Sequence, residues 1–430
     1  MNKEKIAVVG SGISGLSASC ILSKKYEVHL YEKNNYLGGH TRTKNIKDSN
    51  VIHNIDTGFI VFNNNNYPDL VKFFDYLNLE TCNSNMSFSL SLKKPKLEYG
   101  STGINSLFSD KKNLFSFSFW NLLIEIFKLY NQCKNLDKKL IQNLTLEDFL
   151  NNFNYSNKIR DLHIYPMVSC IWSCNKNNVK NFPLESFINF FENHKLFNFS
   201  KRHQWKYVKG GSNQYIKKLI KKNLFTYHLN KTVKKIIRSE KNNIIVLTDN
   251  RKEEFKKIIL ATHANQSMEL LDNPNKEETN ILSKFKYSKN NAYLHSDESF
   301  MPEKKSTWSS WNFKGSATKD NSFSLTYWMN LLQNLKSNKN YFVTINPISI
   351  PKNIYDHTTF EHPIFNLETI EAQKKIHSIQ GFKNTWYCGS YCGYGFHEDG
   401  IQSAAYISEL LGVTLPWKRS ANHYNRLSYI

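Results

Sequence analysis

The sequence predicts an α/β fold in which a Rossmann-like domain, assembled from separated segments, is interleaved with a second, α+β domain. The first observation is the apolar run Ile6 to Val9, which leads through a glycine-rich turn into a helix of small residues. The second is that strand-like runs recur far along the chain, beginning at Trp205, Lys257 and Thr385. Strands that alternate with helices predict a parallel sheet, and their wide spacing predicts a discontinuous domain.

The glycine-rich turn follows the first predicted strand directly. Gly10, Gly12 and Gly15 have the spacing G-x-G-x-x-G, with Ile13 and Ser14 between the last two. The first glycine allows a tight turn, the second lets a pyrophosphate approach the backbone, and the third lets the helix pack on the strand. Free N–H groups at the start of the helix can then face a phosphate. The turn therefore predicts a dinucleotide site.

An acidic residue ends the second predicted strand, Glu27 to Tyr31. Glu32 lies 17 residues after Gly15, where a carboxylate can accept hydrogen bonds from both hydroxyls of an adenosine ribose. Lys33, which follows it, is included in the predicted site. Because strand, turn, helix and acid occur in this order, a purely structural glycine turn is the weaker interpretation.

A second glycine pair helps to decide which dinucleotide is bound. Gly38 and Gly39 are followed by His40 and then by Arg42, a combination that an NAD-binding domain does not need and that FAD-binding chains often have. Here the sequence resembles the superfamily of flavin-containing amine oxidoreductases, which includes monoamine oxidases, protoporphyrinogen oxidases and phytoene desaturases. The common pattern of that superfamily has arginine directly after the glycine pair. In this chain His40 stands there, and the resemblance implies that Arg42 meets the pyrophosphate.

The same resemblance implies further residues of an FAD site. They are Thr57 and Gly58 near the flavin, Val233 at the adenine, Ala261 and Thr262 beside the pyrophosphate, and Gly389, Asp399, Gly400 and Ile401 in a C-terminal segment that opens a helix toward the isoalloxazine ring. The positive end of such a helix favours negative charge on the reduced ring. The residues around Cys388 and Cys392 match the pattern of covalent attachment poorly, so we expect FAD to be bound non-covalently. His397 is the candidate catalytic residue, and its alternative role is a hydrogen bond to the turn backbone.

These segments divide the chain into two domains. We expect an FAD-binding domain formed by residues 1–79, 205–264 and 381–430, and a substrate domain formed by residues 80–204 and 265–380. Residues 55–62 are predicted as a strand with a turn at Gly58. Residues 67–77 are predicted as a helix, and residues 401–411 as the helix after the last strand.

The substrate domain is rich in aromatic residues, above all between residues 113 and 200. Residues 121–132 are predicted to form an amphipathic helix. Its polar stripe comprises Asn121, Glu125, Lys128 and Gln132, and its apolar side comprises Leu122, Leu123, Ile126, Phe127 and Tyr130. Such a helix packs in a core, lies against lipid, or lines a tunnel for an apolar substrate. We expect Phe117 and Phe119 to contact a membrane surface unless both lie in the core.

Composition limits the partners. The 430 residues carry a net charge of +21, but 50 of the 57 basic residues are lysines scattered in short pairs, which does not predict a nucleic-acid partner. A weak attraction to anionic lipid is expected. The seven cysteines, the absence of a leader and the absence of a long apolar stretch predict a cytoplasmic protein, with contact at the inner face of the membrane as an extension. No metal site is predicted.

The leading functional prediction is an FAD-dependent oxidase or desaturase that moves a hydride from a substrate C–H bond to the flavin. The strings DTGFIVFN, WSSWN, TYWMN and GFHEDG resemble one subgroup of the superfamily, which is often encoded beside cyclopropane-fatty-acid-synthase-type methyltransferases. That association implies a lipid acyl chain as substrate. One alternative is an amine oxidase with an aromatic cage supplied by Trp308, Trp311 or Tyr391. Another is a non-redox flavoprotein mutase or isomerase.

Overall fold

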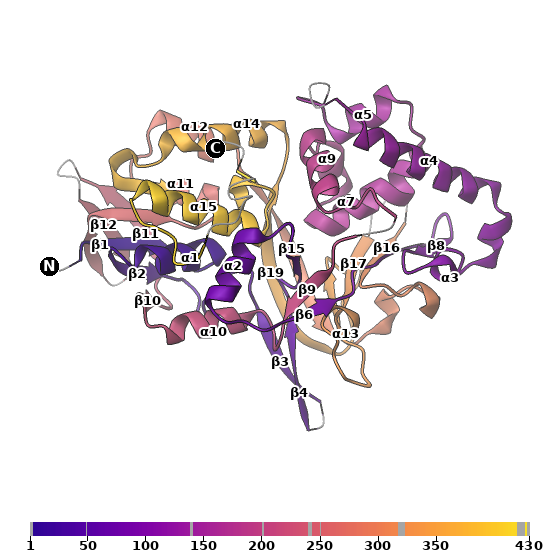
Figure 1. Cartoon of the computed structure of the whole chain (residues 1–430), viewed down its shortest axis with the longest axis horizontal. Helices are drawn as coiled ribbons and strands as arrows, with labels where there is room; N and C mark the ends of the chain where they lie inside the picture. The colour runs from indigo at the N-terminus through magenta and orange to yellow at the C-terminus, as the bar shows by residue number, and fades with distance from the viewer. Residues whose placement is uncertain are drawn as a thin grey trace.

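The computed structural model describes residues 3–48, 50–137, 141–199, 202–239, 243–249, 251–316, 323–418 and 426–427. It has the mixed α/β architecture that the sequence predicts, with two halves side by side (Figure 1). One half surrounds a parallel sheet and contains both ends of the chain. The other half combines a large mixed sheet with a group of helices that includes α4, α5, α7 and α9.

The parallel sheet has five strands in the order β10-β2-β1-β14-β20. Their bounds are Lys5–Val9 (β1), Glu27–Tyr31 (β2), Thr226–His228 (β10), Lys257–Leu260 (β14) and Thr385–Tyr387 (β20). All four pairings between neighbouring strands are parallel. Strands from the beginning, the middle and the end of the chain thus form one sheet. The domain boundaries themselves stay a prediction.

Side chains of β1 alternate between two cores, which explains why its sequence is apolar from Ile6 to Val9. Ile6 and Val8 pack with helices α1 (Ile13–Leu22) and α15 (His397–Leu410). Ala7 and Val9 pack on the opposite side, with a three-stranded antiparallel sheet. The strands of that sheet are β11 (Val233–Arg238), β12 (Ile244–Thr248) and β13 (Lys252–Phe255).

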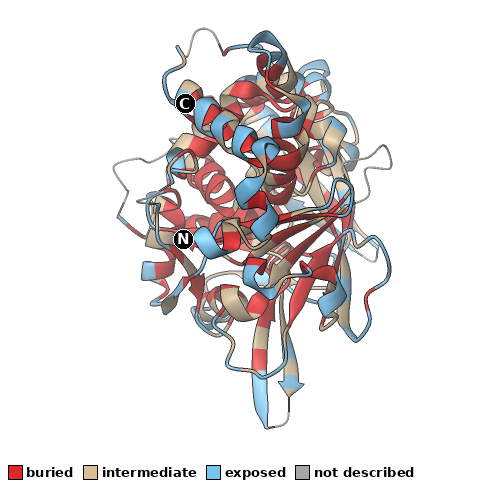
Figure 2. Ribbon diagram, turned by 90° about the vertical axis from the view of Figure 1, so that its right-hand side faces the viewer, coloured by how far each residue is buried: buried red, intermediate tan, exposed pale blue. Residues whose placement is uncertain are grey.

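The second half is built on a seven-stranded sheet in the order β19-β15-β18-β17-β16-β7-β8. Its strands are Phe88–Leu92 (β7), Leu97–Gly100 (β8), Lys286–His295 (β15), Trp311–Gly315 (β16), Phe323–Trp328 (β17), Phe342–Ile345 (β18) and Ile354–Ile364 (β19). The helices packed with it include α4 (Phe117–Lys134), α5 (Leu146–Asn152), α7 (Tyr165–Trp172) and α9 (Leu184–Asn193). β7, β8 and β18 are largely buried, whereas β15 and β19 are partly exposed; Figure 2 shows burial over the whole chain.

Shorter elements connect the two halves. They comprise the hairpin of β3 (Thr43–Asp48) and β4 (Val51–Asp56), the small sheet of β5 (Phe62–Asn63), β9 (Trp205–Val208) and β6 (Thr81–Ser84), and helices α2 (Pro68–Tyr76) and α10 (Asn213–Lys221). The tip of the hairpin is exposed at the bottom of Figure 2. The remaining helices are α3 (Ile104–Leu107), α6 (Asn157–Ile159), α8 (Lys176–Lys180), α11 (Ala264–Leu270), α12 (Lys276–Leu282), α13 (Met329–Leu332) and α14 (Leu367–Lys375).

The predicted strand over residues 55–62 is wrong in its middle, because β4 ends at Asp56 and β5 begins only at Phe62. Between them the backbone pairs with the loop after the second glycine pair. Thr57 N donates to Arg42 O at 2.8 Å, and Phe59 N donates to His40 O at 2.8 Å. This close approach requires Gly58, since a Cβ there would lie 2.0 Å from His40 O.

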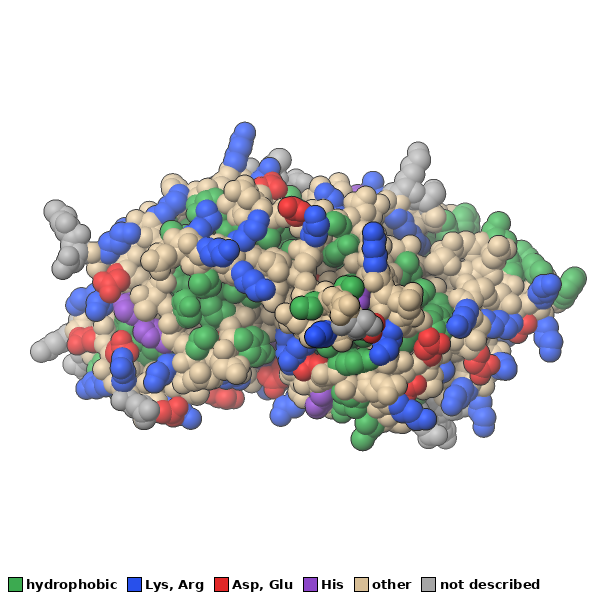
Figure 3. Space-filling view, turned by 90° about the horizontal axis from the view of Figure 1, so that it is seen from below, with side chains coloured by type: hydrophobic (Ala, Val, Ile, Leu, Met, Phe, Trp, Pro, Cys, Tyr) green, Lys and Arg blue, Asp and Glu red, His purple; other side chains and the backbone are tan. Residues whose placement is uncertain are grey.

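The predicted polar stripe of α4 is also wrong in part. Phe127, on the predicted apolar side, is exposed, and Glu125, on the predicted polar stripe, is half-buried because its carboxylate accepts hydrogen bonds from Ser156 N and Oγ. Phe119 lies in the core, whereas Phe117 is 81% exposed. Hydrophobic side chains extend to the right-hand end of the molecule in Figure 3, where this region lies in Figure 1. The predicted division into a polar and an apolar side therefore does not match the observed exposure at Phe127 and Glu125.

Among the described residues, no helix is long and apolar enough to cross a membrane. All seven cysteines are free thiols, and six of them are buried.

Buried histidines predict a loss of stability in acid. His163 joins β8 to α4 by contacts of its ring nitrogens with Tyr99 Oη (3.0 Å) and Tyr130 Oη (2.7 Å). Burial, with a contribution from Arg202, lowers the pKa of His163 to about 3. The pKa in the unfolded chain is about 6.5. The depressed pKa therefore stabilises the fold above pH 6.5, and this contribution is lost as pH falls toward 3.

We expect His163→Gln to reduce this pH dependence. Between pH 7 and pH 5 the free energy of unfolding of the wild type should fall by about 2 kcal/mol more than that of the variant. Denaturant unfolding curves at both pH values measure the difference. Equal pH dependence in the two proteins would show that His163 is accessible to protons in the folded state.

Candidate functional site

The starts of two helices converge at the edge of the parallel sheet. Gly400 lies in the first turn of α15, and a Cβ there would stand 2.7 Å from both Ile13 Cγ2 and Ser14 Oγ of α1. A Cβ on Gly12, at the start of α1, would by contrast meet no heavy atom within 4 Å. Both helix starts carry free N–H groups and a partial positive charge. Their meeting beside open space makes a site for an anionic group such as a pyrophosphate.

The first glycine turn has the geometry that its spacing predicts. Gly10 has φ +98°, and its N–H donates to Tyr31 O at 2.9 Å, so the turn folds back on the end of β2. A Cβ on Gly15 would stand 1.8 Å from Gly10 O. Only glycine therefore lets α1 pack this tightly on the turn.

Glu32 is buried directly over this turn, because β1 and β2 are parallel neighbours whose C-terminal ends meet. One carboxylate oxygen, Oε2, accepts from Ser11 N at 3.1 Å and from Ser11 Oγ at 2.6 Å. The other, Oε1, accepts from Asn34 N at 2.9 Å. The carboxylate is thus fixed beside the open space at Gly12, as a ribose acid needs, and this role stays a prediction.

The second glycine pair packs on the first turn. Gly38 N donates to Ser11 O at 3.0 Å, and Gly39 lies so close that its Cβ would stand 3.1 Å from Gly12 Cα. Both glycines have positive φ. The pair therefore completes the wall of the dinucleotide site, although it lies more than twenty residues further along the chain.

Arg42 connects the two halves of the molecule. Its guanidinium binds the carboxylate of Asp356 on β19 with both terminal nitrogens, and Lys44 Nζ lies 3.0 Å from Asp356 Oδ1. Burial opposes ionisation of Asp356, but hydrogen bonds from Arg42 and Lys44 outweigh it and hold its pKa below the usual value. A contact of Arg42 with a pyrophosphate stays a prediction, since its donors are engaged with Asp356.

Asp56, which the resemblance places near the flavin together with Thr57 and Gly58, anchors this region through its side chain. Its buried carboxylate accepts hydrogen bonds from Thr43 Oγ1 (2.5 Å), from Ser212 N (2.8 Å) and Oγ (2.7 Å), and from Gln333 Nε2 (2.9 Å). These donors come from β3, the start of α10 and the residue after α13. Burial raises the pKa of Asp56 to about 7 despite these bonds.

His397 is the first residue of α15, so the predicted helix begins four residues earlier than the sequence indicated. Its ring stacks on Phe59 with the centroids 3.8 Å apart, and Nε2 lies 2.9 Å from Thr41 Oγ1. Burial, together with the neighbouring His40, lowers the pKa of His397 to about 3. The imidazole is therefore neutral at physiological pH and fixed against the loop that follows the glycine pair.

Three further histidines gather beside it, between the two halves. The ring of His40 lies 5.3 Å from that of His362 on β19 and 6.4 Å from that of His263, which follows β14. Burial is the main cause that lowers their pKa values, to about 4, 3 and 4 respectively. Their separation in sequence left no signal for this group. The described residues contain no cluster of three ligands suited to a metal.

Polar atoms without hydrogen-bond partners surround the start of α15. Within the described part of the chain these buried atoms include Asn63 Nδ2, Asn66 Oδ1 and His194 Nε2. Arg426 Nη2 donates to Asn66 O at 2.6 Å, and Arg426 Nη1 lies 3.6 Å from Asp399 Oδ1. A buried polar group costs about 1–3 kcal/mol if it stays unpaired. The cluster therefore fits the polar atoms of a bound cofactor or substrate.

The other predicted residues lie around the same sheet edge. Among them, Lys33 has an exposed side chain. Ala261 and Thr262 follow β14, Val233 begins β11, Gly389 follows β20, Thr57 and Gly58 follow β4, and Ile401 lies in the first turns of α15. Ala261 N donates to Val9 O at 2.9 Å. Asp399 Oδ2 accepts from Phe396 N at 2.7 Å and so fixes the start of α15.

The aromatic cage of the amine-oxidase alternative does not assemble. Trp308 packs with Met301 and Phe342, and Tyr391 belongs to the core beside the antiparallel sheet. Trp311 packs on the helical core of the other half. The three side chains therefore lie in separate clusters.

Two glycine variants separate fold from binding. Gly12→Ala should leave the melting temperature unchanged, because φ −64° and ψ −179° suit alanine and the Cβ meets no atom. It should weaken FAD binding by roughly tenfold or more, about 1.4 kcal/mol, because the methyl group faces the predicted pyrophosphate position. Gly15→Ala is the matched control and should lower the melting temperature. Calorimetry measures the melting temperature, and titration with FAD measures the affinity. Unchanged FAD affinity in Gly12→Ala would contradict the assignment of the pyrophosphate to this turn.

Glu32→Gln tests the ribose contact. The variant keeps the shape of the side chain but loses the negative charge, so each hydrogen bond to a ribose hydroxyl should lose part of its 1.5–3 kcal/mol, roughly the range for a charged acceptor. Fluorescence titration of the apoprotein with FAD measures the affinity. Glu27→Gln, at the exposed start of β2, is the control and should bind FAD as the wild type does. Equal affinities of all three proteins would contradict the assignment.

Comparison with known proteins agrees with this geometry. Residues 8–77 match the family of the NAD(P)-binding Rossmann-like domain. No curated protein sequence matches the chain.

Solved structures extend the similarity to the whole fold. A CLA-producing fatty acid isomerase from P. acnes superposes with a TM-score of 0.69 at 15% identity, covering 95% of this chain and 98% of that one. Cyclohexylamine oxidase from Brevibacterium oxydans IH-35A gives 0.65 at 16% identity, with 95% and 100% covered. Putrescine oxidase bound to putrescine gives 0.66 at 14% identity, with 95% and 99% covered. The chain therefore shares its overall fold with these proteins.

Proposed function

We propose that this protein binds FAD non-covalently and is an oxidoreductase that transfers a hydride from a C–H bond of a lipid acyl chain to the flavin. The observation that carries the cofactor assignment is the convergence of the α1 and α15 helix starts beside Gly12, with Glu32 next to them. Two helix ends supply positive charge for a pyrophosphate, and the carboxylate supplies acceptors for a ribose.

The protein residues would hold and shield the reacting groups. The bound flavin supplies the ring that accepts the hydride. His397 stacks on Phe59, and His40, His263 and His362 lie together between the two halves, with the Glu361 carboxylate 3.2 Å from His263 Nδ1. These imidazoles are neutral at physiological pH, so none of them is an acid that would compete for the reacting carbon. Hydride transfer then needs a correctly placed C–H bond more than an acid–base pair.

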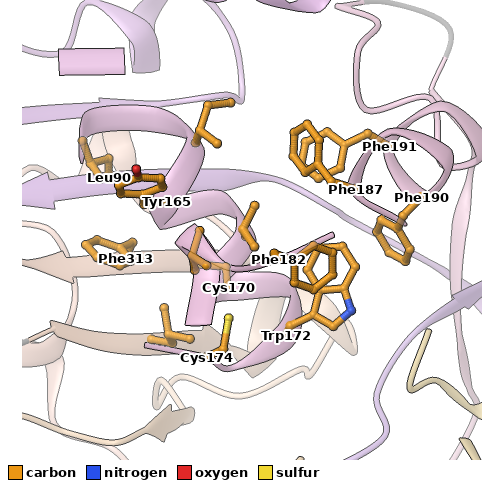
Figure 4. Close-up of a cluster of buried hydrophobic side chains, with 14 of the residues drawn as sticks. Leu90, Tyr165, Cys170, Trp172, Cys174, Phe182, Phe187, Phe190, Phe191 and Phe313 are labelled. Carbon is orange, nitrogen blue, oxygen red and sulfur yellow. The ribbon is translucent and has the colours of Figure 1, made fainter. Parts of the chain in front are cut away.

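An apolar substrate is supported by the side chains that reach the start of α15 from the helical half. The rings of Trp172 and Phe190 lie 4.7 Å apart, and Phe190 stacks on Phe396 at 5.2 Å. Trp172 Nε1 donates to Tyr394 O at 3.1 Å, so the indole is fixed with its apolar surface among phenylalanines. Figure 4 shows Trp172 and Phe182 beside each other, with Phe190 nearby. These rings suit an acyl chain better than a charged amine.

The similar structures allow two other reactions. One of them is a fatty acid isomerase, which supports a lipid substrate but with no net oxidation. Others are oxidases of amines, for which the dispersed Trp308, Trp311 and Tyr391 offer no cage.

We place the protein in the cytoplasm, at the inner face of a membrane, in keeping with its lysine excess and proposed substrate.

The purified protein should be yellow and should release free FAD on acid precipitation. Anaerobic mixing with phospholipid should bleach the flavin, and mass spectrometry should find a lipid product that has lost two hydrogen atoms. A product of unchanged mass would favour the isomerase, and bleaching only by amines would favour the amine oxidase. Protein that purifies without flavin and binds none would contradict the proposal.

His397→Gln should slow bleaching by lipid far more than bleaching by dithionite, whereas an equal effect on both would assign His397 a structural role.

A further inference from the structure

Exposed hydrophobic side chains concentrate on one part of the helical half. They are Leu114 and Phe115, at the end of a short 3-10 helix (Lys111–Phe115), and Phe117, Trp120, Ile124 and Phe127 of α4, and we call these six the α4 aromatic face. Phe115 is 91% exposed and Phe117 is 81% exposed. Helix α4 lies toward the right-hand end of the molecule in Figure 1, and hydrophobic side chains gather at that end in Figure 3. Contiguous exposed apolar surface of this kind marks an interaction site.

The spacing along α4 places its four members on one side of the helix. Phe117, Trp120, Ile124 and Phe127 follow one another at intervals of three and four residues, the period of a helical face. Phe119, Leu122, Ile126 and Leu129 form a second apolar side, which is buried in the core. A helix that served only the core would carry polar residues outside. The outer apolar side of α4 therefore needs a partner of its own.

This face is held in place by the protein beneath it. Trp120 Nε1 donates to Leu114 O at 2.9 Å, which ties α4 to the preceding 3-10 helix. Ser116 Oγ accepts from Phe119 N and so caps the start of α4. Phe127 stacks on Phe199 with the centroids 6.2 Å apart. The aromatic rings are thus presented from a fixed scaffold.

The charges around the face identify the partner. Between residues 104 and 134 the exposed lysines are Lys111, Lys112, Lys128 and Lys134, and none of them forms an ion pair with another described residue. The two acids of this stretch are engaged, since Asp110 lies 3.4 Å from Lys304 and Glu125 accepts from Ser156. Aromatic rings flanked by free lysines match an anionic lipid surface. The rings enter the acyl boundary while the lysines extend to the head groups.

We propose that the α4 aromatic face docks the protein in the interface of an anionic membrane, with α4 lying along the surface. The proposal deepens the proposed function, because a docked protein would meet lipid acyl chains where they are held. Docking rests on the proposed function only in the reason given for it, which is access to the lipid substrate. Docking itself depends on the α4 aromatic face and the four lysines.

Sedimentation with vesicles tests the proposal on the complete protein. Wild-type protein should pellet with vesicles that contain phosphatidylglycerol at low ionic strength, should be released as salt rises, and should bind pure phosphatidylcholine vesicles more weakly. Phe117→Ser combined with Phe127→Ser should weaken binding by roughly tenfold or more, because two exposed rings lose their burial in lipid. The absorption spectrum of bound flavin and the melting temperature should not change.

A matched control uses exposed apolar residues elsewhere. Ile348→Ser combined with Ile350→Ser, in the segment after β18, removes two exposed side chains outside the face and should bind vesicles as the wild type does. Lys111→Glu combined with Lys112→Glu gives a second variant that leaves every ring in place. It should weaken binding to the anionic vesicles and leave binding to the neutral ones unchanged.

Three outcomes would overturn the proposal. The first is equal pelleting of the wild type and the phenylalanine variant, and the second is no pelleting of the wild type with either vesicle. The third is a wild-type dimer in light scattering that the phenylalanine variant converts to a monomer without any vesicle binding, which would make the face a contact between two copies. A protein that binds vesicles but whose flavin is not bleached by lipid would contradict the proposed function alone.

Discussion

The constraint on which the site depends is the contact between the starts of α1 and α15. Gly400 allows it, because any side chain there would strike Ile13 and Ser14. Two positive helix ends brought this close repel each other in a medium of low polarity, and an anionic ligand between them removes the repulsion. The parallel sheet fixes this arrangement. β1 precedes α1, and Cys388, just after β20, donates its N–H to Leu260 O, at the end of β14. The order of the strands in the sheet therefore determines whether the two helix starts can form the predicted pyrophosphate site.

The two halves are then joined by polar contacts as well as by the apolar contacts of Phe396 with Trp172 and Phe190. Arg42 and Lys44 share Asp356 of β19, and Asp56 collects hydrogen bonds from three separate elements. Because the Arg42–Asp356 pair is partly buried, removing one partner leaves the other charge without its counter-charge, which lowers stability. These contacts determine where the seven-stranded sheet stands relative to the glycine turns. They thus fix how the half with the proposed cofactor site is held against the half with the proposed substrate region.

The imidazoles beside the proposed flavin are polar but carry no charge at neutral pH. His40, His263, His362 and His397 all have lowered pKa values, chiefly because burial penalises the protonated ring. A lipid C–H bond carries no charge to be recognised, so neutral imidazoles suit it. The α4 aromatic face, on the helical half, has the opposite character. There the apolar rings of α4 are exposed and the lysines are charged, which suits the boundary between water and lipid.

The sequence by itself determined the parts of the protein that depend on neighbours in the chain. The strand, glycine turn, helix and acid between Ile6 and Glu32 form one local unit, and its predicted strand Glu27–Tyr31 has the same bounds in the structure. Only the tertiary structure decided which distant groups meet. Arg42 and Asp356 are 314 residues apart, and the four histidines come from four separate segments. It also decided that Phe127 faces outward, because periodicity shows that a helix has sides but not which of them the rest of the fold will cover.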